Sequence, residues 1–164
     1  MKIHDQVTEE RRKLAELIEG FDIAMLTFID GQGALISQPM GPIELDAEGN
    51  IWFFTDSHSE KTQHLEELNL AFSGESDGTY VSLSGSGELV TDQARKEELW
   101  SPFVKPWFPE GPDSPNLALL KFVPHTAEYW DAPHSKVVRL FAMAASIMAA
   151  RPIGLGDHEH LNHL

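Results

Sequence analysis

The sequence predicts one α+β domain in which about six mostly antiparallel strands close into a small β-barrel with helices at its periphery. Short apolar runs alternate with turn sequences rich in glycine, aspartate and asparagine, and helical spacing occurs only before, between and after these runs. Closure into a barrel is favoured over an open sheet because it removes unpaired strand edges. The 164 residues are 41% hydrophobic and show no internal repeat or linker, so residues 1–164 are expected to share one core.

The first expected element is an amphipathic helix within residues 1–20. Its apolar residues Leu14, Leu17 and Ile18 recur at helical spacing, and Gly20 stands where a helix C-cap glycine is expected. The segment is charged and lacks the apolar core of a signal peptide, so we do not expect export.

The strands follow in a meander. Six segments are predicted as strands, at residues 23–29, 34–40, 51–55, 70–74, 80–90 and 117–130. Pro39 and Pro42 are expected to interrupt the second strand and leave it at a sheet edge, with backbone groups free for another partner. Gly85 and Gly87 predict a bulge or tight curve in the fifth strand, and Pro124 predicts a bend in the sixth.

The connections and the C-terminal part complete the predicted fold. Further helices are expected at residues 59–68, 92–100 and 137–150. Ser59 and Asp92 are suitable N-cap residues for the first two. Residues 101–115 carry five prolines and are expected to form an ordered, irregular loop. Residues 151–164 are expected to be a flexible tail.

The composition excludes several classes of protein. A formal net charge of −14 opposes binding to a phosphate backbone, so nucleic acid is not an expected partner. The chain has no cysteine, which excludes disulfides and thiolate zinc sites and fits a reducing cytoplasm. The longest apolar stretch, residues 140–150, is about 11 residues, whereas a bilayer requires roughly 20, so we expect a soluble protein without a membrane partner.

The stretch from Phe54 to Lys61 joins an apolar strand to the start of a helix and gathers groups that bind phosphate. Thr55 and Ser59 carry hydroxyl donors, a helix N-terminus supplies free N–H groups, and Lys61 supplies positive charge. An ordinary serine cap beside a solvated lysine would produce the same local pattern. Both interpretations stay open on these residues alone.

A second candidate stretch reads Ser37-Gln38-Pro39-Met40 and follows an apolar run. It could place backbone amides and the Gln38 side chain against a flat heteroaromatic ring, and Pro39 frees one side from strand pairing. A proline-broken edge strand that binds no ligand explains the same residues.

Four tryptophans are many for this length, and such rings either fill cores or stack on planar ligands. Trp52 is expected in the core. Trp107 lies in the proline-rich loop and Trp130 at a strand end, positions that suit a pocket or a subunit contact.

Three histidines lie near the C-terminus, at His158, His160 and His163. Their spacing would allow metal binding, but a metal site needs fixed ligand geometry and a second shell of hydrogen bonds. A terminal Gly-Asp-His-Glu-His segment is more often mobile, so no metal is expected.

Three pieces of sequence occur in a specific order: Leu99-Trp100, the loop 107–115 reading Trp-Phe-Pro-Glu-Gly-Pro-Asp-Ser-Pro, and Glu128-Tyr129-Trp130-Asp131. Together with the Phe-Thr-Asp, Ser and Lys spacing of residues 54–61, they resemble the pyridoxamine 5′-phosphate oxidase-like superfamily of FMN-binding split barrels. The resemblance is strongest to its general stress protein 26 branch and covers nearly the whole chain.

The resemblance implies a flavoprotein with a split β-barrel that binds FMN at the seam of a homodimer. The residues it assigns to FMN are Ser37, Gln38, Pro39, Met40, Phe54, Thr55, Ser59, Lys61, Trp107 and Trp130. Thr55, Ser59 and Lys61 would hold the phosphate, and residues 37–40 would run beside the isoalloxazine ring. Trp130 would approach the flavin from the neighbouring subunit, and Trp107 would cover the ring.

The chain also departs from the family pattern. Glu60 stands where the oxidases usually carry a second phosphate-binding arginine, and Gln38 stands where relatives often have arginine. Two positive charges are therefore missing near the phosphate, and weak FMN binding is expected. Residues 131–136 lack the arginine and histidine pair that grips pyridoxal phosphate, so oxidation of vitamin B6 is not expected.

Three functions fit this reading of the sequence. A cytoplasmic flavin-dependent oxidoreductase would exchange hydride or electrons with a small molecule or a nicotinamide. A non-catalytic flavin-binding or storage protein would use the same site without turnover. A barrel without a cofactor would serve as an interaction module. No side chain is an obvious acid or base, so no catalytic residue is assigned.

Overall fold

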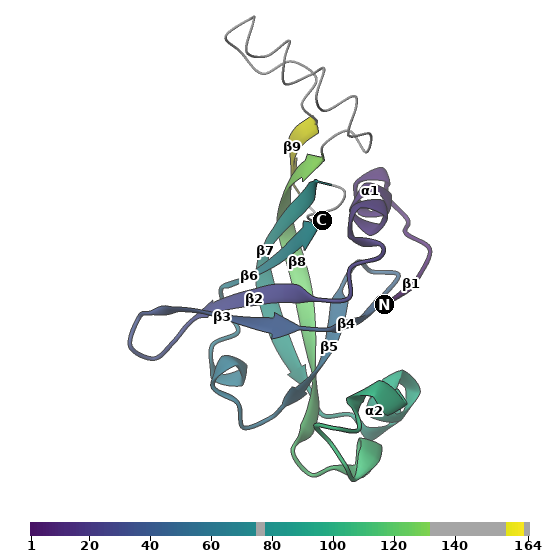
Figure 1. The fold of residues 1–164 in the computed structure, drawn as a ribbon, viewed down its shortest axis with the longest axis vertical. Helices are drawn as coiled ribbons and strands as arrows, with labels where there is room; N and C mark the ends of the chain where they lie inside the picture. Colours follow the sequence, from purple (N-terminus) through teal and green to yellow (C-terminus); the bar gives the residue numbers. More distant parts are fainter. Residues whose placement is uncertain (75–77, 132–156, 163–164) are drawn as a thin grey trace, which may run out of the picture.

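The described part of the chain forms one nine-stranded sheet that curls on itself, with two α-helices outside it (Figure 1). The computed structural model describes residues 1–74, 78–131 and 157–162. The strands are β1 (Lys2–Ile3), β2 (Ala24–Ile29), β3 (Leu35–Met40), β4 (Pro42–Leu45), β5 (Ile51–Asp56), β6 (Leu68–Gly74), β7 (Thr79–Val90), β8 (Leu117–Asp131) and β9 (Asp157–Asn162). The helices are α1 (Glu9–Ile18), α2 (Gln93–Leu99) and the 3-10 turns η1 (Glu60–Gln63), η2 (Pro102–Val104) and η3 (Gly111–Asp113).

The order of strands explains why the sheet must curl. It runs β1-β4-β5-β8-β7-β6-β2-β3, with β9 added to β8, and every pairing except β1 with β4 is antiparallel. Gly41 alone separates β3, at one end of this order, from β4, near the other end. One residue cannot span a flat sheet, so the two ends must approach each other. The predicted α+β split barrel is confirmed.

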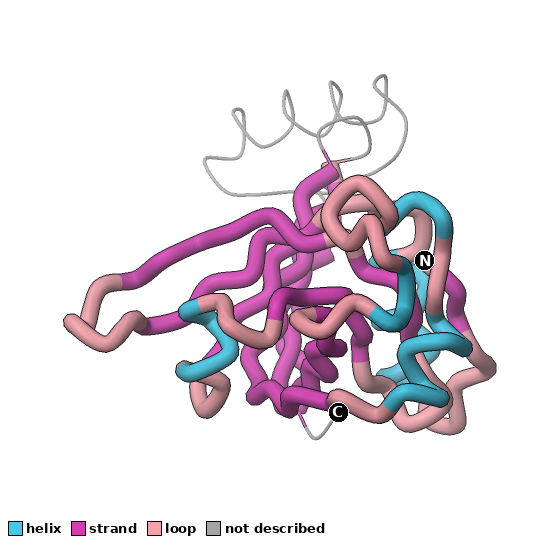
Figure 2. Tube along the Cα trace, turned by 90° about the horizontal axis from the view of Figure 1, so that it is seen from below, coloured by secondary structure: helices cyan, strands magenta, loops and turns pink. Residues whose placement is uncertain are grey.

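The core fills the concave side of this sheet. Its largest fully buried side chains include Phe28, Phe53, Phe72 and Phe122, which come from four different strands. Helix α1 closes the core with the apolar face predicted for it, while its polar face remains in solvent. The β2–β3 hairpin projects away from this body in both views (Figures 1 and 2).

All six predicted strands form, and β1, β4 and β9 are additional. The prediction that Pro39 and Pro42 interrupt the second strand is wrong, because Pro39 pairs with Met25 inside β3 and Pro42 begins β4. A proline is accommodated in β3 because this strand is at the edge of the sheet order. The chain instead turns at Gly41.

The predicted helix over residues 59–68 is also wrong. Only Glu60–Gln63 form a short 3-10 turn, and Ser59 precedes it without a side-chain cap hydrogen bond. Leu68 is buried and pairs with Phe28 and Gly85 as the first residue of β6. The pairing and burial of Leu68 therefore outweigh the helical spacing of this segment.

The glycine-marked bulge is confirmed. The β7–β8 register shifts between Ser84 and Gly85, and Gly85 lies opposite Pro124. A Cβ atom at Gly85 would lie 2.2 Å from the carbonyl oxygen of Val123, so only glycine allows the strands to approach this closely.

The remaining predictions have different outcomes. Helix α2 follows its Asp92 cap, and the proline-rich loop is irregular apart from η2 and η3. Residues 157–162 pair with β8 as β9, where a flexible tail was expected. β7 occupies one edge of β8, and β5 covers only residues 117–122 of the other edge, which leaves the second half of that edge open for β9. The helix predicted at 137–150 lies outside the described residues. Within the described ranges, no helix combines the length and apolar character that a membrane crossing requires.

Candidate functional site

The turn between β5 and η1 is fixed by Asp56 and by the start of β8. The Asp56 carboxylate accepts hydrogen bonds from the His58 backbone N–H at 2.8 Å and from Asn116 Nδ2 at 2.7 Å. These two bonds, with the nearby charges of His58 and Lys61, lower the pKa of Asp56. The Ser57 N–H donates in turn to the Asn116 carbonyl. This network fixes the backbone that leads to Lys61 and directs the Asp56 charge toward Asn116.

Lys61 meets the second candidate stretch through a hydrogen bond. Its Nζ donates to Gln38 Oε1 at 3.1 Å, so η1 contacts the edge strand β3. Burial lowers the pKa of Lys61, and the charge of Asp56 partly offsets this effect. No carboxylate in the described part of the chain forms an ion pair with the Lys61 ammonium. A partly buried cation with one neutral acceptor is suited to bind an anion.

Thr55 supplies a second unsatisfied group. Its side chain is 3% exposed, and its Oγ1 has no hydrogen-bond partner among the described residues. In β5 it lies on the same face as the core residues Ile51 and Phe53. A buried hydroxyl without a partner is costly, so this atom fits a site that a polar ligand completes.

Phe54 points to the opposite face of β5. Its ring packs edge-on against Trp100, with 5.7 Å between ring centroids. Only the backbone of Phe54 is therefore available to a ligand beside Thr55. Successive side chains of a strand point to opposite faces, so the side chains of Phe54 and Thr55 do not face one ligand together.

Ser59 already uses its hydroxyl proton. Its Oγ donates to the Asp56 carbonyl oxygen at 2.7 Å, so donation to a phosphate would require the hydroxyl to rotate. The backbone N–H groups of Glu60 and Lys61 form no hydrogen bond within the described ranges and remain available as donors.

The stretch Ser37 to Met40 alternates across β3. Gln38 and Met40 face the concave side, where Met40 joins the core, whereas Ser37 and Pro39 face outward. Ser37 Oγ lies 2.6 Å from Thr27 Oγ1 on β2. Because β3 pairs only with β2 in the described sheet, one row of its backbone groups is unpaired and open to a ligand.

The two predicted tryptophans do not join this group within one chain. Trp107 lies between η2 and η3, is 73% exposed, and makes no described contact with Lys61 or Gln38. Trp130 lies on β8 opposite Tyr80, and β7, β6 and β2 separate it from β3. The structure thus brings Gln38 and Lys61 together and leaves both tryptophans apart.

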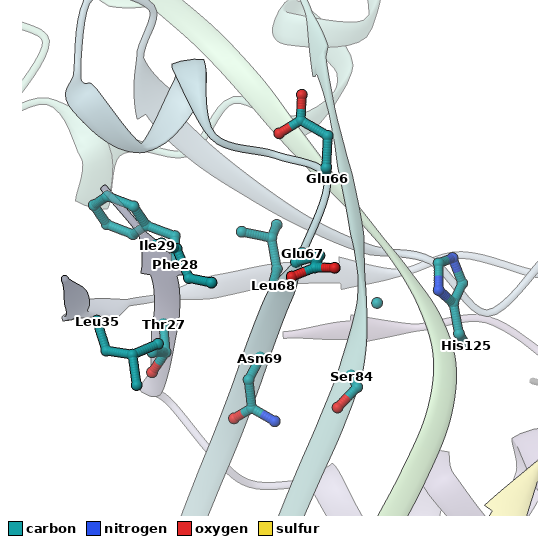
Figure 3. Close-up of a pocket in the computed structure, with 11 residues that line it drawn as sticks. Thr27, Phe28, Ile29, Leu35, Glu66, Glu67, Leu68, Asn69, Ser84 and His125 are labelled. Carbon is teal, nitrogen blue, oxygen red and sulfur yellow. The ribbon is translucent and has the colours of Figure 1, made fainter. Parts of the chain in front are cut away.

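A cavity of about 520 Å³, whose lining is drawn in Figure 3, is lined mainly by side chains of the convex side of the sheet and by neither Lys61 nor Gln38. We call this side the outer face; it carries the cross-strand partners Thr27, Ser37, Asn69, Ser84 and Thr126. Sequence reasoning missed the cavity because its walls come from β2, β3, β6, β7, β8 and the segment before β6. It also missed the role of Asn116, which lies 60 residues from Asp56 and carries no local signal.

The fold and the site define a split barrel in which a partly buried lysine, Lys61 of η1, contacts the edge strand β3. The model of the family described as "Pyridoxamine 5′-phosphate oxidase like" matches residues 9–152. The chain belongs to this family, which confirms the resemblance seen in the sequence.

Known structures and a curated relative agree with this assignment. A protein assigned to general stress protein 26 from Jannaschia sp. CCS1 has a TM-score of 0.74 and 26% identity, covering 95% of this chain and 99% of that one. The general stress FMN/FAD binding protein of Xanthomonas citri has a TM-score of 0.64 and 33% identity, covering 76% and 90%. The protein bli-3 of Neurospora crassa is 25% identical over 152 residues, covering 85% of this chain and 73% of that protein.

Proposed function

We propose that this protein binds FMN, with the flavin phosphate at Lys61 and the isoalloxazine ring beside residues 37–40 of β3. The hydrogen bond between Lys61 and Gln38 carries this proposal, because it joins the two stretches to which the family resemblance assigns the phosphate and the ring. The unpartnered Thr55 hydroxyl and the free N–H groups of η1 supply further donors. The name of the X. citri relative, an FMN/FAD binding protein, supports the same ligand.

In this proposal, the phosphate takes the place of Gln38 as the partner of Lys61. A charged acceptor forms a stronger hydrogen bond with an ammonium than a neutral amide does, by roughly a factor of two. Gln38 is then free to turn its amide toward the ring. Glu60 next to Lys61 adds no positive charge, so a single cation faces the phosphate and affinity is expected to be weak.

The outer face supports a homodimer that completes the site. Large apolar side chains are exposed there on four strands: Met25, Ile29, Leu35, Tyr80 and Trp130. Four strand spacings of about 4.8 Å separate Trp130 from β3 within one chain, which is roughly 19 Å along the sheet. This separation supports the proposal that Trp130 approaches a ring on β3 from a second copy whose outer face packs against the first.

A bound flavin would supply hydride or electron transfer, and the residues described here would bind and orient it. We propose an oxidoreductase with a small-molecule or nicotinamide partner. The non-catalytic alternative uses the same binding residues. Reduction of the FMN-loaded protein by NADH or NADPH, followed by reoxidation with an added quinone, supports the oxidoreductase; a flavin that stays oxidised supports storage.

A fluorescence titration of FMN tests the binding site. Lys61→Met keeps the length of the buried stem but removes the charge, and Lys105→Met removes an exposed lysine of the proline-rich loop as the matched control. We expect Lys61→Met to weaken FMN binding at least tenfold, about 1.4 kcal/mol, and Lys105→Met to have no effect. Equal affinities of the wild type and both variants would contradict the phosphate site.

A further inference from the structure

The cavity on the outer face has the size of a small-molecule site and a lining of apolar and polar residues (Figure 3). Its volume of about 520 Å³ lies within the range of roughly 300–1,000 Å³ that is usual for ligand pockets. Phe28 and Leu68, both buried, and Gly85 contribute apolar surface to it.

The cavity borders the strand that we assign to the flavin ring. Thr27 lines the cavity, and its Oγ1 lies 2.6 Å from Ser37 Oγ on β3. Leu35, two residues before Ser37, also lines it. A molecule in the cavity would therefore lie near Ser37 on the outer side of β3.

The polar part of the lining is acidic or neutral. Glu66 and Glu67 lie on the segment between η1 and β6, are exposed, and form no ion pair in the described part of the chain. Asn69 and Ser84 add neutral hydrogen-bonding groups, and no lysine or arginine lines the cavity. His125 at the rim lies near the Ser86 hydroxyl, 3.3 Å from Nε2 to Oγ.

We infer that this cavity binds a small molecule that is cationic or neutral, and that it rejects anions. The two unpaired carboxylates and the overall charge of −14 give the cavity a negative potential. A phosphorylated substrate would place its negative charge beside Glu66 and Glu67. The position of this ligand next to a flavin rests on the proposed function, whereas its binding to the cavity does not.

Three probes with the same ring and different charge test the inference: 1-methylnicotinamide (cation), nicotinamide (neutral) and nicotinate (anion). Binding is measured on the full chain by ligand-observed NMR, with and without FMN. We expect 1-methylnicotinamide to bind most tightly, nicotinamide less tightly, and nicotinate at least tenfold more weakly than the cation.

Variants locate the binding. The double variant Glu66→Gln with Glu67→Gln should weaken the binding of 1-methylnicotinamide at least fivefold and bring its affinity closer to that of nicotinate. Glu10→Gln with Glu16→Gln, which changes two exposed carboxylates of α1, should leave all three affinities unchanged. Ser84→Leu, at an exposed position of the lining, should weaken all three probes by filling the cavity.

The FMN titration separates this inference from the proposed function. Probes that fail to bind while FMN binds would overturn the cavity site. The cavity site would also be overturned if the three probes bound with equal affinity, or if Ser84→Leu left their affinities unchanged. Charge-selective probe binding in a protein that ignores FMN would support the cavity and overturn only the flavin site.

Discussion

At the residue scale, the site depends on groups that burial leaves incompletely paired. Lys61 loses part of its hydration, which lowers its pKa, and has only the neutral Gln38 as an acceptor. Thr55 is buried with an unpaired hydroxyl. The buried Asp46 differs, since it accepts from Trp52 Nε1 at 2.8 Å and from Asn50 N at 2.8 Å. Gln6 Oε1 and Ser114 Oγ are also buried without a described partner, so it is the combination with Lys61 that distinguishes Thr55.

Asp46 yields a pH-dependent stability prediction. Burial alone would raise the pKa of Asp46, but hydrogen bonds from Trp52, Asn50 and Glu48 outweigh it and lower the pKa. A lowered folded-state pKa stabilises the fold above the unfolded-state pKa of about 3.9, and this contribution is lost as the pH falls through the folded value. Asp46→Asn places an NH₂ group where a carboxylate oxygen accepts from Trp52 or Asn50. We expect it to lower the free energy of unfolding by about 2 kcal/mol at pH 7.

Urea denaturation at pH 7 and pH 3 measures this effect. The difference in the free energy of unfolding between wild type and Asp46→Asn should be smaller at pH 3, because the wild-type carboxylate is then partly protonated and stabilises the fold less. Glu48→Gln changes an exposed carboxylate of the same turn and should stay within about 0.5 kcal/mol of wild type. A difference that grows at pH 3 would rule out the assigned role of the Asp46 carboxylate.

At the element scale, a buried ion-pair cluster ties β1 and α2 to β4. Glu44 is 1% exposed and accepts from Arg95, while His4 Nε2 lies 2.7 Å away. The Arg95 guanidinium also stacks on Trp52, 4.6 Å from the ring centroid, and pairs with Glu98. Arg95 therefore anchors α2, whose following loop leads to Asn116 and the β5–η1 turn.

Removing Arg95 should destabilise the protein strongly. Arg95→Met leaves the Glu44 carboxylate buried with fewer partners, and we expect a loss of about 3 kcal/mol in the free energy of unfolding. Glu98→Gln breaks only the exposed half of the network and should cost less than about 0.5 kcal/mol. Chemical denaturation of both variants measures these values; equal losses would show that Glu44 does not depend on Arg95.

Prediction from sequence succeeded for elements with strong local patterns. The alternation of residues 80–90 and the Asp92 cap both led to the observed elements. β4 was missed because it is four residues long and begins with a proline, and β1 because it has only two residues. The helix predicted at 59–68 failed because tertiary pairing of Leu68 is not visible in local spacing.

The site was predictable in its parts but not in its assembly. The residue types of 37–40 and 54–61 suggested a ring and a phosphate, and the contact of Gln38 with Lys61 supports that pairing. The tie from Asp56 to Asn116 depends on the register of β5 with β8, whereas the opposite orientations of Phe54 and Thr55 follow from the alternation of side chains along a strand. That register requires the whole sheet, so the sequence of one segment does not contain it.

At the scale of the whole molecule, the exposed apolar side chains of the outer face are the basis for the proposed homodimer. A double variant, Met25→Asp with Tyr80→Asp, places charges on β2 and β7 within this face, where both side chains are more than 40% exposed. Desolvating two carboxylates in an interface is costly, so we expect the wild type to sediment as the proposed dimer and this variant as a monomer.

Sedimentation equilibrium measures the two masses. Val7→Asp introduces a charge at another exposed apolar residue, 77% exposed and away from the sheet, and should leave the dimer intact. A wild-type protein that sediments as a monomer would contradict the shared site, and so would a double variant that remains dimeric.

The affinity ratio of riboflavin and FMN tests the central claim most directly, because the two ligands differ only by the phosphate. In the wild type we expect FMN to bind at least tenfold more tightly than riboflavin, about 1.4 kcal/mol. In Lys61→Met this preference should largely disappear while riboflavin affinity stays the same. A wild-type protein that does not distinguish the two ligands, or a Lys61→Met variant that keeps the full preference, would contradict a phosphate site at Lys61.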